Sequence, residues 1–312
     1  MEYRNLGSSG LKVSEIGLGT DTFGPWADEQ TSISIVSHAL DLGVDFIDTA
    51  DVYGQGQSEE FIGKAVKGKR SQVLIATKFG MAMGEGPNEC GASRYHIVKA
   101  VEDSLRRLNT DYIDLYQVHW PDPTTPIEET LRTLDDLVRA GKVRYIGCSN
   151  FAAWQLCESL WTSKVNNLHS FVTLQPRYNL IDRSIEQELV PCCLAYGIGV
   201  IPWYPLAAGF LTGKYRRGEA LPVGTRLASS STVSSRIVSD ANFDKLAKLE
   251  AFASEHGHSV AELAIVWLLS HPWLSTVIAG VTKIEQVSAN VAAAEWKLTG
   301  DEVTQLEEIS QA

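Results

Sequence analysis

Short apolar runs alternate with longer amphipathic segments along almost the whole chain. The runs typical of strands are 15–18, 44–48, 73–77, 112–118, 144–148, 171–174, 199–203 and 276–279. Several of them are nearly continuously apolar, as expected for strands whose two faces are both covered. Segments between them, such as 93–108, carry apolar residues at helical spacing. Eight strands that alternate with helices predict an α/β fold, a closed parallel (β/α)8 TIM barrel.

Other segments add detail to this barrel. Two short runs within 3–13, separated by a turn that contains Gly7 and Gly10, predict an N-terminal hairpin. Segments 128–140 and 184–196 predict helices that end at a glycine. The stretch 206–240 is the longest irregular one, and it follows the seventh strand, so it lies at the mouth of the barrel. No linker divides the chain, which predicts one domain over 1–312 with extra C-terminal helices.

An open doubly wound sheet is the competing fold class. That fold normally carries GxGxxG between its first strand and a helix that follows at once. Here the first strand ends in GLGTDTFG, residues 17–24, which lacks this spacing. The sequence therefore favours the barrel.

Four ionisable residues follow successive strands of the predicted barrel. Asp48 ends the second apolar run and Tyr53 lies just beyond it, while Lys78 and His119 follow the third and fourth runs. In a parallel barrel the carboxyl ends of the strands meet at one mouth, where active sites are built. An ammonium near a phenol lowers its pKa from about 10. We therefore expect Lys78 to tune Tyr53, Asp48 to hold Lys78, and His119 to contact a substrate carbonyl.

Each of the four residues also has an ordinary structural explanation when it is taken alone. Asp48 is a plausible helix cap, Tyr53 a rim aromatic, Lys78 a side chain reaching solvent, and His119 a core histidine. Their occurrence at the same end of consecutive strands favours a site for general acid–base catalysis. The chain has no GxSxG elbow and no metal-ligand histidine spacing, so no metal is expected. Acid catalysis at a carbonyl then suggests hydride transfer from a nicotinamide.

The amino-acid composition limits the kinds of partner that the chain is expected to bind. The net charge of −11 in 312 residues argues against nucleic acid and anionic membranes as partners. The five cysteines lack zinc-type spacing, the first ten residues are polar, and no apolar run is long enough to span a bilayer. These features predict a cytoplasmic protein with free thiols, a monomer or weak homo-oligomer.

Three segments carry a resemblance to a known family. Residues 48–59, DTADVYGQGQSE, resemble the signature of the aldo-keto reductase superfamily, with Lys78 and His119 at its other catalytic positions. The segments IGCSNF at 146–151 and GFLTGKY at 209–215 resemble the bacterial and plant-type reductases, a branch related to potassium-channel β subunits. The resemblance covers 3–309 and implies NADP(H)-dependent reduction of an aldehyde or ketone, with Tyr53 as proton donor. The alternative that it leaves open is a redox-sensing NADP-binding interaction subunit with little turnover.

The cofactor is expected to lie on residues scattered along the strand ends. Ser149, Asn150 and Gln175 offer the donors and acceptors that a carboxamide needs, and Tyr204 offers a ring for stacking. Lys283 begins a helix, where an anion is favoured, which predicts the 2′-phosphate of NADP there. The full predicted cofactor set is Gly19, Thr20, Asp21, Ser149, Asn150, Gln175, Tyr204, Pro205, Leu206, Ala207, Gly209, Leu211, Gly213, Lys214, Arg226, Ala279, Gly280, Val281, Thr282, Lys283, Gln286 and Asn290.

Aromatic residues after the strands are the expected walls of the substrate pocket. Trp26 and Trp120 are the main candidates, with Phe79 and Phe23 as weaker ones. Aromatic walls suit small-molecule aldehydes and ketones of aromatic, terpenoid or sugar type.

Overall fold

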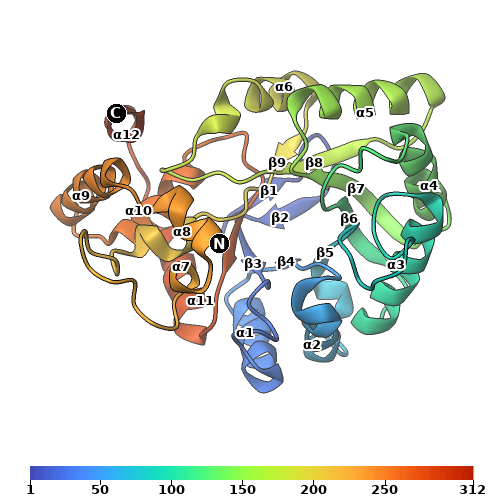
Figure 1. Cartoon of the computed structure of the whole chain (residues 1–312), viewed down its shortest axis with the longest axis horizontal. Helices are drawn as coiled ribbons and strands as arrows, with labels where there is room; N and C mark the ends of the chain where they lie inside the picture. Colours follow the sequence, from blue (N-terminus) through green and yellow to red (C-terminus); the bar gives the residue numbers. More distant parts are fainter. Residues whose placement is uncertain (312) are drawn as a thin grey trace.

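Eight parallel strands occupy the centre of the computed structural model, which describes residues 1–311 (Figure 1). They are β3 (Ile16–Gly19), β4 (Phe46–Asp48), β5 (Leu74–Phe79), β6 (Ile113–Val118), β7 (Val143–Ser149), β8 (Phe171–Gln175), β9 (Gly199–Val200) and β10 (Val277–Gly280). The order in the sheet is β10-β3-β4-β5-β6-β7-β8-β9, so each strand lies beside its neighbour in sequence and β10 returns to β3. Each predicted strand overlaps one of these eight, and the predicted fold class is confirmed.

Backbone hydrogen bonds bring the two ends of this sheet together. Ser275 N donates to Val200 O at 2.9 Å, and Ile278 N donates to Pro202 O at 3.2 Å. These bonds join β9 and the residues just after it to β10 and the residues just before it. The sheet therefore curls round into a barrel.

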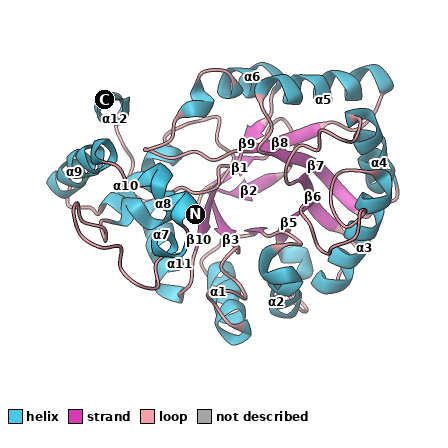
Figure 2. Cartoon of the chain, in the orientation of Figure 1, coloured by secondary structure: helices cyan, strands magenta, loops and turns pink. Residues whose placement is uncertain are grey.

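Helices surround the sheet, with cyan helices outside magenta strands in Figure 2. The ring comprises α1 (Glu29–Asp41), α2 (Gln57–Ala65), α3 (Arg94–Leu108), α4 (Ile127–Arg139), α5 (Ala153–Asn166), α6 (Leu189–Tyr196), α10 (Val260–Leu269) and α11 (Ile284–Ala293). Outside the ring lie α7 (Arg226–Ser229), α8 (Ser231–Ile237), α9 (Asp240–Glu255) and α12 (Gly300–Gln311). Short 3₁₀ turns are η1 (Tyr53–Gly56), η2 (Arg70–Gln72), η3 (Ser184–Glu186) and η4 (Ala207–Thr212).

Two predicted segments differ from the structure. The segment 184–196 is not one helix, because η3 ends at Glu186 and α6 begins at Leu189. Glu188, the N-cap of α6, has a φ of −129°, which breaks the helical path. The segment 206–240, expected to be irregular, contains η4, α7 and α8. Ser230, whose hydroxyl caps the first turn of α8, is one of the polar residues that made this stretch look like a loop.

Alternation along the strands divides the interior into two cores. Phe46 and Ala76 point into the barrel, whereas Ile47 and Ile75 pack against the outer helices. The hairpin of β1 (Tyr3–Asn5) and β2 (Lys12–Ser14) closes the bottom of the barrel, where Leu6 and Val13 join Phe46 and Ala76 in one buried cluster. The same alternation places Asp48 and Lys78 inside the barrel, above this apolar layer, since they follow Phe46 and Ala76 by two residues.

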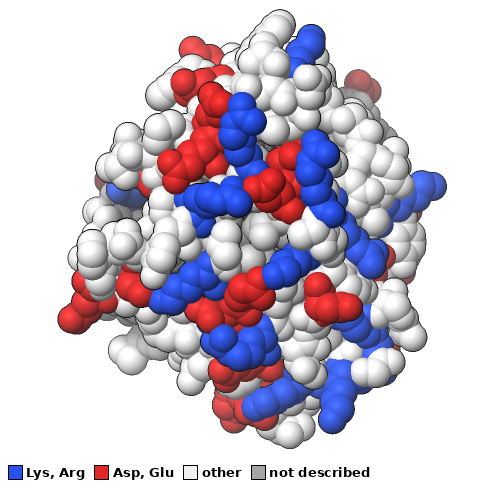
Figure 3. Space-filling view, turned by 90° about the vertical axis from the view of Figure 1, so that its right-hand side faces the viewer, with Lys and Arg blue, Asp and Glu red and all other residues white. Residues whose placement is uncertain are grey.

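Charged side chains of both signs are interspersed on the face over α3 and α4 (Figure 3). Arg94 pairs with Asp136 and Arg132 pairs with Glu128 on this surface. Exposed pairs of this kind contribute little to stability individually. No broad patch of one sign is visible on this face, which is compatible with an acidic chain whose charge is spread out.

Leu6 allows a test of the hairpin as the floor of the barrel. Its side chain is fully buried, so Leu6→Ala should leave a cavity and lower the free energy of unfolding by about 2–4 kcal/mol. Urea denaturation followed by circular dichroism measures the change. Val223→Ala, at a fully exposed residue, is the matched control and should change stability by less than about 0.5 kcal/mol. A Leu6→Ala variant as stable as this control would contradict the assignment.

Candidate active site

The four predicted catalytic residues, Asp48, Tyr53, Lys78 and His119, form a tetrad. The ammonium group of Lys78 lies at its centre. Its Nζ donates to Asp48 Oδ2 at 2.8 Å and to the backbone carbonyl of Thr49 at 2.7 Å, and it lies 3.4 Å from the hydroxyl of Tyr53. Lys78 is fully buried and Asp48 is 3% exposed. Lys78 therefore does not reach solvent but approaches Tyr53, and Asp48 caps no helix but pairs with Lys78.

Two glutamines complete the surroundings of Asp48. Gln175 Nε2 donates to Asp48 Oδ1 at 2.7 Å, and Gln117 Nε2 lies 3.5 Å from the same oxygen. Burial raises the pKa of Asp48, and the nearby Lys78 ammonium and the Gln175 amide oppose that rise. Gln175, predicted from the sequence as a cofactor contact, thus also positions the tetrad.

Tyr53 lies on the turn η1 between β4 and α2. Gly56, with a φ of 92°, ends this turn, and a Cβ there would lie 2.7 Å from Arg107 Cδ. Arg107 in turn binds the buried carboxylate of Glu59 in α2 at 2.7 Å. The turn that presents Tyr53 is therefore packed against a fixed guanidinium, and only glycine fits at position 56.

The phenol of Tyr53 is a protonated group at neutral pH. Burial raises its pKa well above the usual value, and the carboxylates of Asp48 and Asp21 add to the rise. This direction is opposite to the lowering expected from Lys78 alone. The reason is that the sequence places the ammonium near the phenol but does not reveal that the site is desolvated and rich in carboxylates.

His119 completes the tetrad at the carboxyl end of β6. Its ring lies edge-on to Tyr53, with centroids 5.9 Å apart, and it is 8% exposed. Burial lowers its pKa to about 3, and the charge of Lys78 contributes to the shift. Its Nδ1 is buried without a hydrogen-bond partner among the described residues. His119 is therefore neutral across the physiological range.

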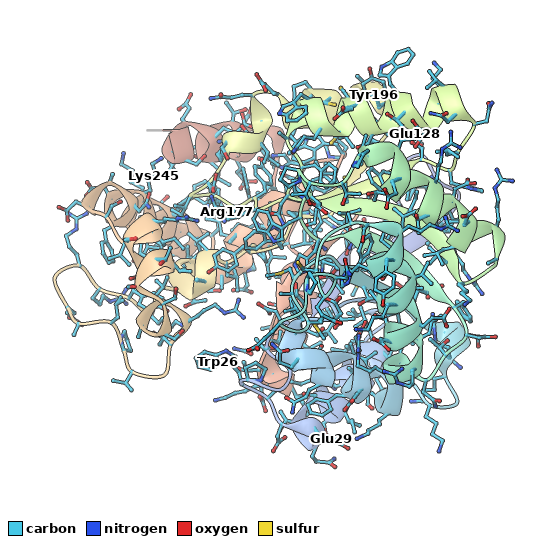
Figure 4. The ribbon with its side chains drawn as sticks, turned by 45° about the vertical axis from the view of Figure 1, so that its right-hand side comes forward. Trp26, Glu29, Glu128, Arg177, Tyr196 and Lys245 are labelled. Carbon is cyan, nitrogen blue, oxygen red and sulfur yellow. The ribbon has the colours of Figure 1, made fainter. Side chains whose placement is uncertain are left out.

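A cavity of about 370 Å³ opens above the tetrad. Tyr53, Asp48 and His119 line it, together with Trp26, Trp120 and the unpredicted Trp203. Trp26 extends from the loop after β3 toward the segment that carries α7, as labelled in Figure 4. Both predicted tryptophans therefore reach the cavity.

Phe79 and Phe23, the weaker predicted walls, do not line this cavity. Both rings are fully buried. Phe79 packs against Tyr116 with ring centroids 4.8 Å apart, on the outer side of the sheet. The strand alternation that turns Lys78 inward turns its neighbour Phe79 outward.

Most of the predicted cofactor residues line the same cavity. These are Gly19, Thr20, Asp21, Ser149, Asn150, Gln175, Tyr204, Pro205, Leu206, Gly209, Lys214, Arg226, Gly280, Thr282 and Gln286. The cavity lining does not include Ala207, Leu211, Gly213, Ala279, Val281, Lys283 and Asn290. Among the latter, Leu211 and Val281 are core residues, because their side chains are buried.

One wall of the cavity has unusual backbone. Asn150 and Tyr204 have left-handed φ values of 61° and 70°, which are uncommon for side-chain-bearing residues. Side-chain amides hold them: Asn150 Nδ2 donates to His119 O at 3.0 Å, and Asn179 Nδ2 donates to Tyr204 O at 3.0 Å. Trp203 Nε1 also donates to Asn150 Oδ1 at 3.3 Å. Strain held by such contacts is common at functional sites.

An ion pair spans the mouth of the cavity. Arg226 Nη2, at the start of α7, lies 2.8 Å from Asp21 Oδ2, two residues beyond the end of β3. The segment after β9 thus reaches past β10 and contacts the loop after β3 at the mouth of the cavity. Since both side chains are partly exposed, the pair is held only weakly.

The N-terminus of α11 carries its own cap. Gln286 Oε1 accepts from Thr282 N at 2.7 Å and from Lys283 N at 3.2 Å. These are the amides from which the sequence predicts that an anion would receive hydrogen bonds. An anion could bind there only after the side chain of Gln286 had turned away.

Gln117, Trp203 and Arg107 are among the residues of the site that were not singled out from the sequence. Gln117 precedes His119 by two residues, so strand alternation could have placed it inside the barrel. Trp203 lies beside Tyr204 at the end of the seventh predicted strand. Arg107 had no sequence signal, because it reaches the site from α3.

Two other kinds of feature are absent from residues 1–311. None of their helices combines the length and apolar character needed to cross a membrane. The same residues contain no group of three or more His, Cys, Asp and Glu side chains placed to hold a metal ion.

Known proteins resemble the chain over almost its full length. The model of the aldo/keto reductase family matches residues 15–311. The chain is 39% identical to a probable voltage-gated potassium channel subunit beta of Oryza sativa subsp. japonica, over 100% of this chain and 97% of the relative. It is 39% identical to a versiconal hemiacetal acetate reductase of Aspergillus parasiticus, over 99% and 96%. It is 40% identical to an aldo-keto reductase of Bacillus subtilis (strain 168), over 97% and 91%.

The lowered pKa of His119 predicts a pH dependence of stability. Its folded pKa of about 3 lies below the unfolded value of about 6.5, so the unfolded chain binds the extra proton. His119 therefore does not reduce the free energy of unfolding above pH 6.5. As the pH falls from 6.5 toward 3, the proton bound by His119 in the unfolded chain lowers that free energy progressively. The full loss is about 5 kcal/mol, of which about 3 kcal/mol occurs above pH 4.

Stability curves of wild type and His119→Gln between pH 7.5 and 4 measure this effect. We expect wild type to lose stability relative to the variant as the pH falls below 6.5. His38→Gln, at a histidine on the surface whose Nε2 contacts Ser288, is the control and should stay parallel to wild type. A constant difference between wild type and His119→Gln would show that His119 is not held neutral.

Proposed function

The chain belongs to the aldo/keto reductase family, and we propose that it is an NADP(H)-dependent oxidoreductase that reversibly reduces an aldehyde or ketone to an alcohol. One observation carries the proposal: Lys78 Nζ contacts Asp48 at 2.8 Å and the phenol of Tyr53 at 3.4 Å at the base of the cavity. A buried ammonium beside a phenol at the base of an open cavity suits proton transfer to a substrate.

The cavity has the groups that a nicotinamide cofactor requires. Ser149 and Asn150 are joined by a hydrogen bond of 3.0 Å and offer hydroxyl and amide groups beside His119. Tyr204 offers an aromatic face at the wall, while Lys214 and Arg226 supply positive charge for a diphosphate. When bound there, the nicotinamide supplies the hydride for the carbonyl carbon.

In this proposal Tyr53 supplies the proton. Its hydroxyl donates to the carbonyl oxygen as negative charge develops there, and Lys78 stabilises the phenolate left behind. Asp48 keeps Lys78 in place and limits the cost of a buried ammonium. In the reverse direction the phenolate accepts the proton of the alcohol.

His119 orients the substrate. A neutral imidazole donates a hydrogen bond to the carbonyl oxygen without competing to supply the proton, which suits a pKa lowered to about 3. Trp26 and Trp120, which line the cavity, then provide apolar walls, as in many sites for small organic ligands. This arrangement favours small aldehydes and ketones that carry an apolar or aromatic group.

A second function rests on the names of several relatives. Relatives from rice, Arabidopsis thaliana and Schizosaccharomyces pombe are named as probable or putative channel β subunits. An interaction subunit of that kind would bind the cofactor and turn over little. Steady-state turnover on small carbonyls distinguishes the two possibilities, because only the enzyme oxidises NADPH at a substrate-dependent rate.

Tyr53→Phe tests the proposed proton donor. Loss of the hydroxyl should lower kcat for aldehyde reduction by about 10²–10⁴-fold, because the general acid is removed. NADPH oxidation at 340 nm measures turnover, and quenching of tryptophan fluorescence measures NADPH binding, which should be unchanged. Tyr116→Phe is the matched control, since that buried phenol faces the outer helices and should leave kcat unaltered. Full activity in Tyr53→Phe would remove Tyr53 from this role.

Lys283→Ala tests the proposed 2′-phosphate contact. Lys283 is exposed at the N-cap of α11, so its ammonium is free to bind a phosphate at that helix start. Its loss should raise the Kd for NADPH about tenfold, as expected for one charge-assisted hydrogen bond, and leave the Kd for NADH unchanged. Isothermal titration measures both. Lys297→Ala, at a lysine paired with Glu2, is the control; equal losses for both cofactors would contradict the 2′-phosphate role.

A further inference from the structure

Four of the five cysteines lie in one region of the barrel wall. Cys148 is on β7, Cys157 on α5, and Cys192 and Cys193 on α6, whereas Cys90 lies exposed on the loop after β5. In Figure 1, α5 and α6 lie side by side at the edge of the barrel. This region is separate from the cavity, because none of the four cysteines lines it.

Two of these thiols are in contact. Cys157 Sγ and Cys192 Sγ are 3.3 Å apart, and we call them the thiol pair. Cys192 Sγ also lies 3.8 Å from the carbonyl oxygen of Ala153, one helical turn before Cys157. The sulfur of Cys192 therefore lies against one face of α5, and no other residue separates the two thiols.

A second contact fixes the register of the two helices. Trp161 Nε1 donates to the hydroxyl of Tyr196 at 3.1 Å. Trp161 follows Cys157 by one helical turn on α5, and Tyr196 follows Cys192 by one turn on α6. Tyr196 points outward at the end of its helix in Figure 4. Two consecutive contacts at the same spacing hold α5 and α6 parallel with the thiols facing each other.

Accessibility distinguishes the thiol pair from its neighbours. Cys157 and Cys192 are partly exposed, whereas Cys148 and Cys193 are buried. A small oxidant can therefore reach the pair from solvent without unfolding the barrel. A disulfide needs a sulfur separation of about 2.05 Å, so the pair must close by little more than 1 Å.

We propose that Cys157 and Cys192 form a redox-sensitive modification site, in which a small disulfide oxidant of the glutathione class converts the pair into an intramolecular disulfide that ties α5 to α6. The site does not depend on the proposed reductase function. It rests on the sulfur contact, the register of the helices and the exposure of the two thiols.

The chemistry proceeds by two thiol–disulfide exchanges. The thiolate of Cys157 attacks one sulfur of oxidised glutathione, which forms a mixed disulfide and releases one glutathione thiolate. Cys192 then loses its proton to water and attacks the Cys157 sulfur, which releases the second glutathione thiolate. The two protein thiols lose two electrons, and the oxidant gains them as two thiols.

The surroundings of Cys192 lower its reactivity as a first nucleophile. Burial raises the pKa of Cys192 to about 12, and its contact with Cys157 adds to the rise. Only thiolates attack disulfides, so Cys192 is a poor first nucleophile. Whichever thiol reacts first, its partner lies 3.3 Å away and can resolve the mixed disulfide, and both orders give the same internal link.

The disulfide would stabilise the barrel wall next to the cavity. Cys157 and Cys192 are 35 residues apart in sequence, so the link closes a loop that includes β8 and restricts the unfolded chain. In addition, α5 begins three residues after Asn150, which lines the cavity. Oxidation should raise the melting temperature by about 5 °C.

Oxidation of the purified full-length chain with oxidised glutathione at pH 8 tests the proposal. In Cys90→Ser, which lacks the exposed thiol that would itself retain glutathione, we expect two of the four remaining titratable thiols to be lost, with a mass decrease of about 2 Da and no retained glutathione. Non-reducing peptide mapping should join the peptides of Cys157 and Cys192, and dithiothreitol should reverse the link and the gain in melting temperature.

Single serine variants supply the controls. Cys192→Ser should keep glutathione on Cys157 as a stable mixed disulfide, and Cys157→Ser should form no internal link. Wild type, which keeps the exposed Cys90, should form the same internal link and carry in addition one glutathione on Cys90. Intact thiols at both Cys157 and Cys192 after oxidation, a Cys192–Cys193 link, or glutathione retained on both members of the pair would each overturn the proposal.

Discussion

A charged pair buried inside the barrel constrains the rest of the site. Lys78 and Asp48 are almost completely excluded from water, and their 2.8 Å contact must offset the desolvation of two ions. The pair is held by Thr49 O, Gln175 and, at 3.5 Å, Gln117, which come from the loop after β4, from β8 and from β6. Any shift of one strand would leave a buried charge without a partner. The ion pair therefore fixes the relative positions of strands that lie on different sides of the barrel.

The position of Tyr53 follows from this constraint. The chain leaves β4 at Asp48 and turns through η1, and the packing of Gly56 on Arg107 fixes where the turn ends. This brings the phenol to 3.4 Å from the ammonium while burial keeps it protonated. A protonated phenol beside a fixed cation is well suited to give up its proton only when negative charge appears on a bound carbonyl. The proposed catalysis is thus a property of the barrel interior as well as of the tyrosine.

The contacts in the barrel wall that carries the thiol pair differ from those around the buried ion pair. There, two outer helices run in parallel register, and their contacts involve weakly polar sulfurs and an indole–phenol hydrogen bond. No buried charge holds these helices, so a covalent link would add a constraint that the barrel lacks. The connection from β7 into α5 links the cavity to this wall, because Ser149 and Asn150 line the cavity and Cys157 lies on α5.

The sequence alone determined the barrel, its hairpin and the grouping of Asp48, Tyr53, Lys78 and His119, because strand alternation and the shared end of parallel strands follow from local pattern. It also placed Trp26 and Trp120 at the mouth. Tertiary structure decided what depends on burial and on distant contacts: the raised pKa of Tyr53, the outward ring of Phe79, the Gln286 cap on α11, and the ion pair from Arg226 to Asp21. It also decided that Cys157 meets Cys192 across 35 residues. The physical reason is that desolvation and the facing of side chains on separate elements arise only when the barrel closes, and no local pattern in the sequence encodes them.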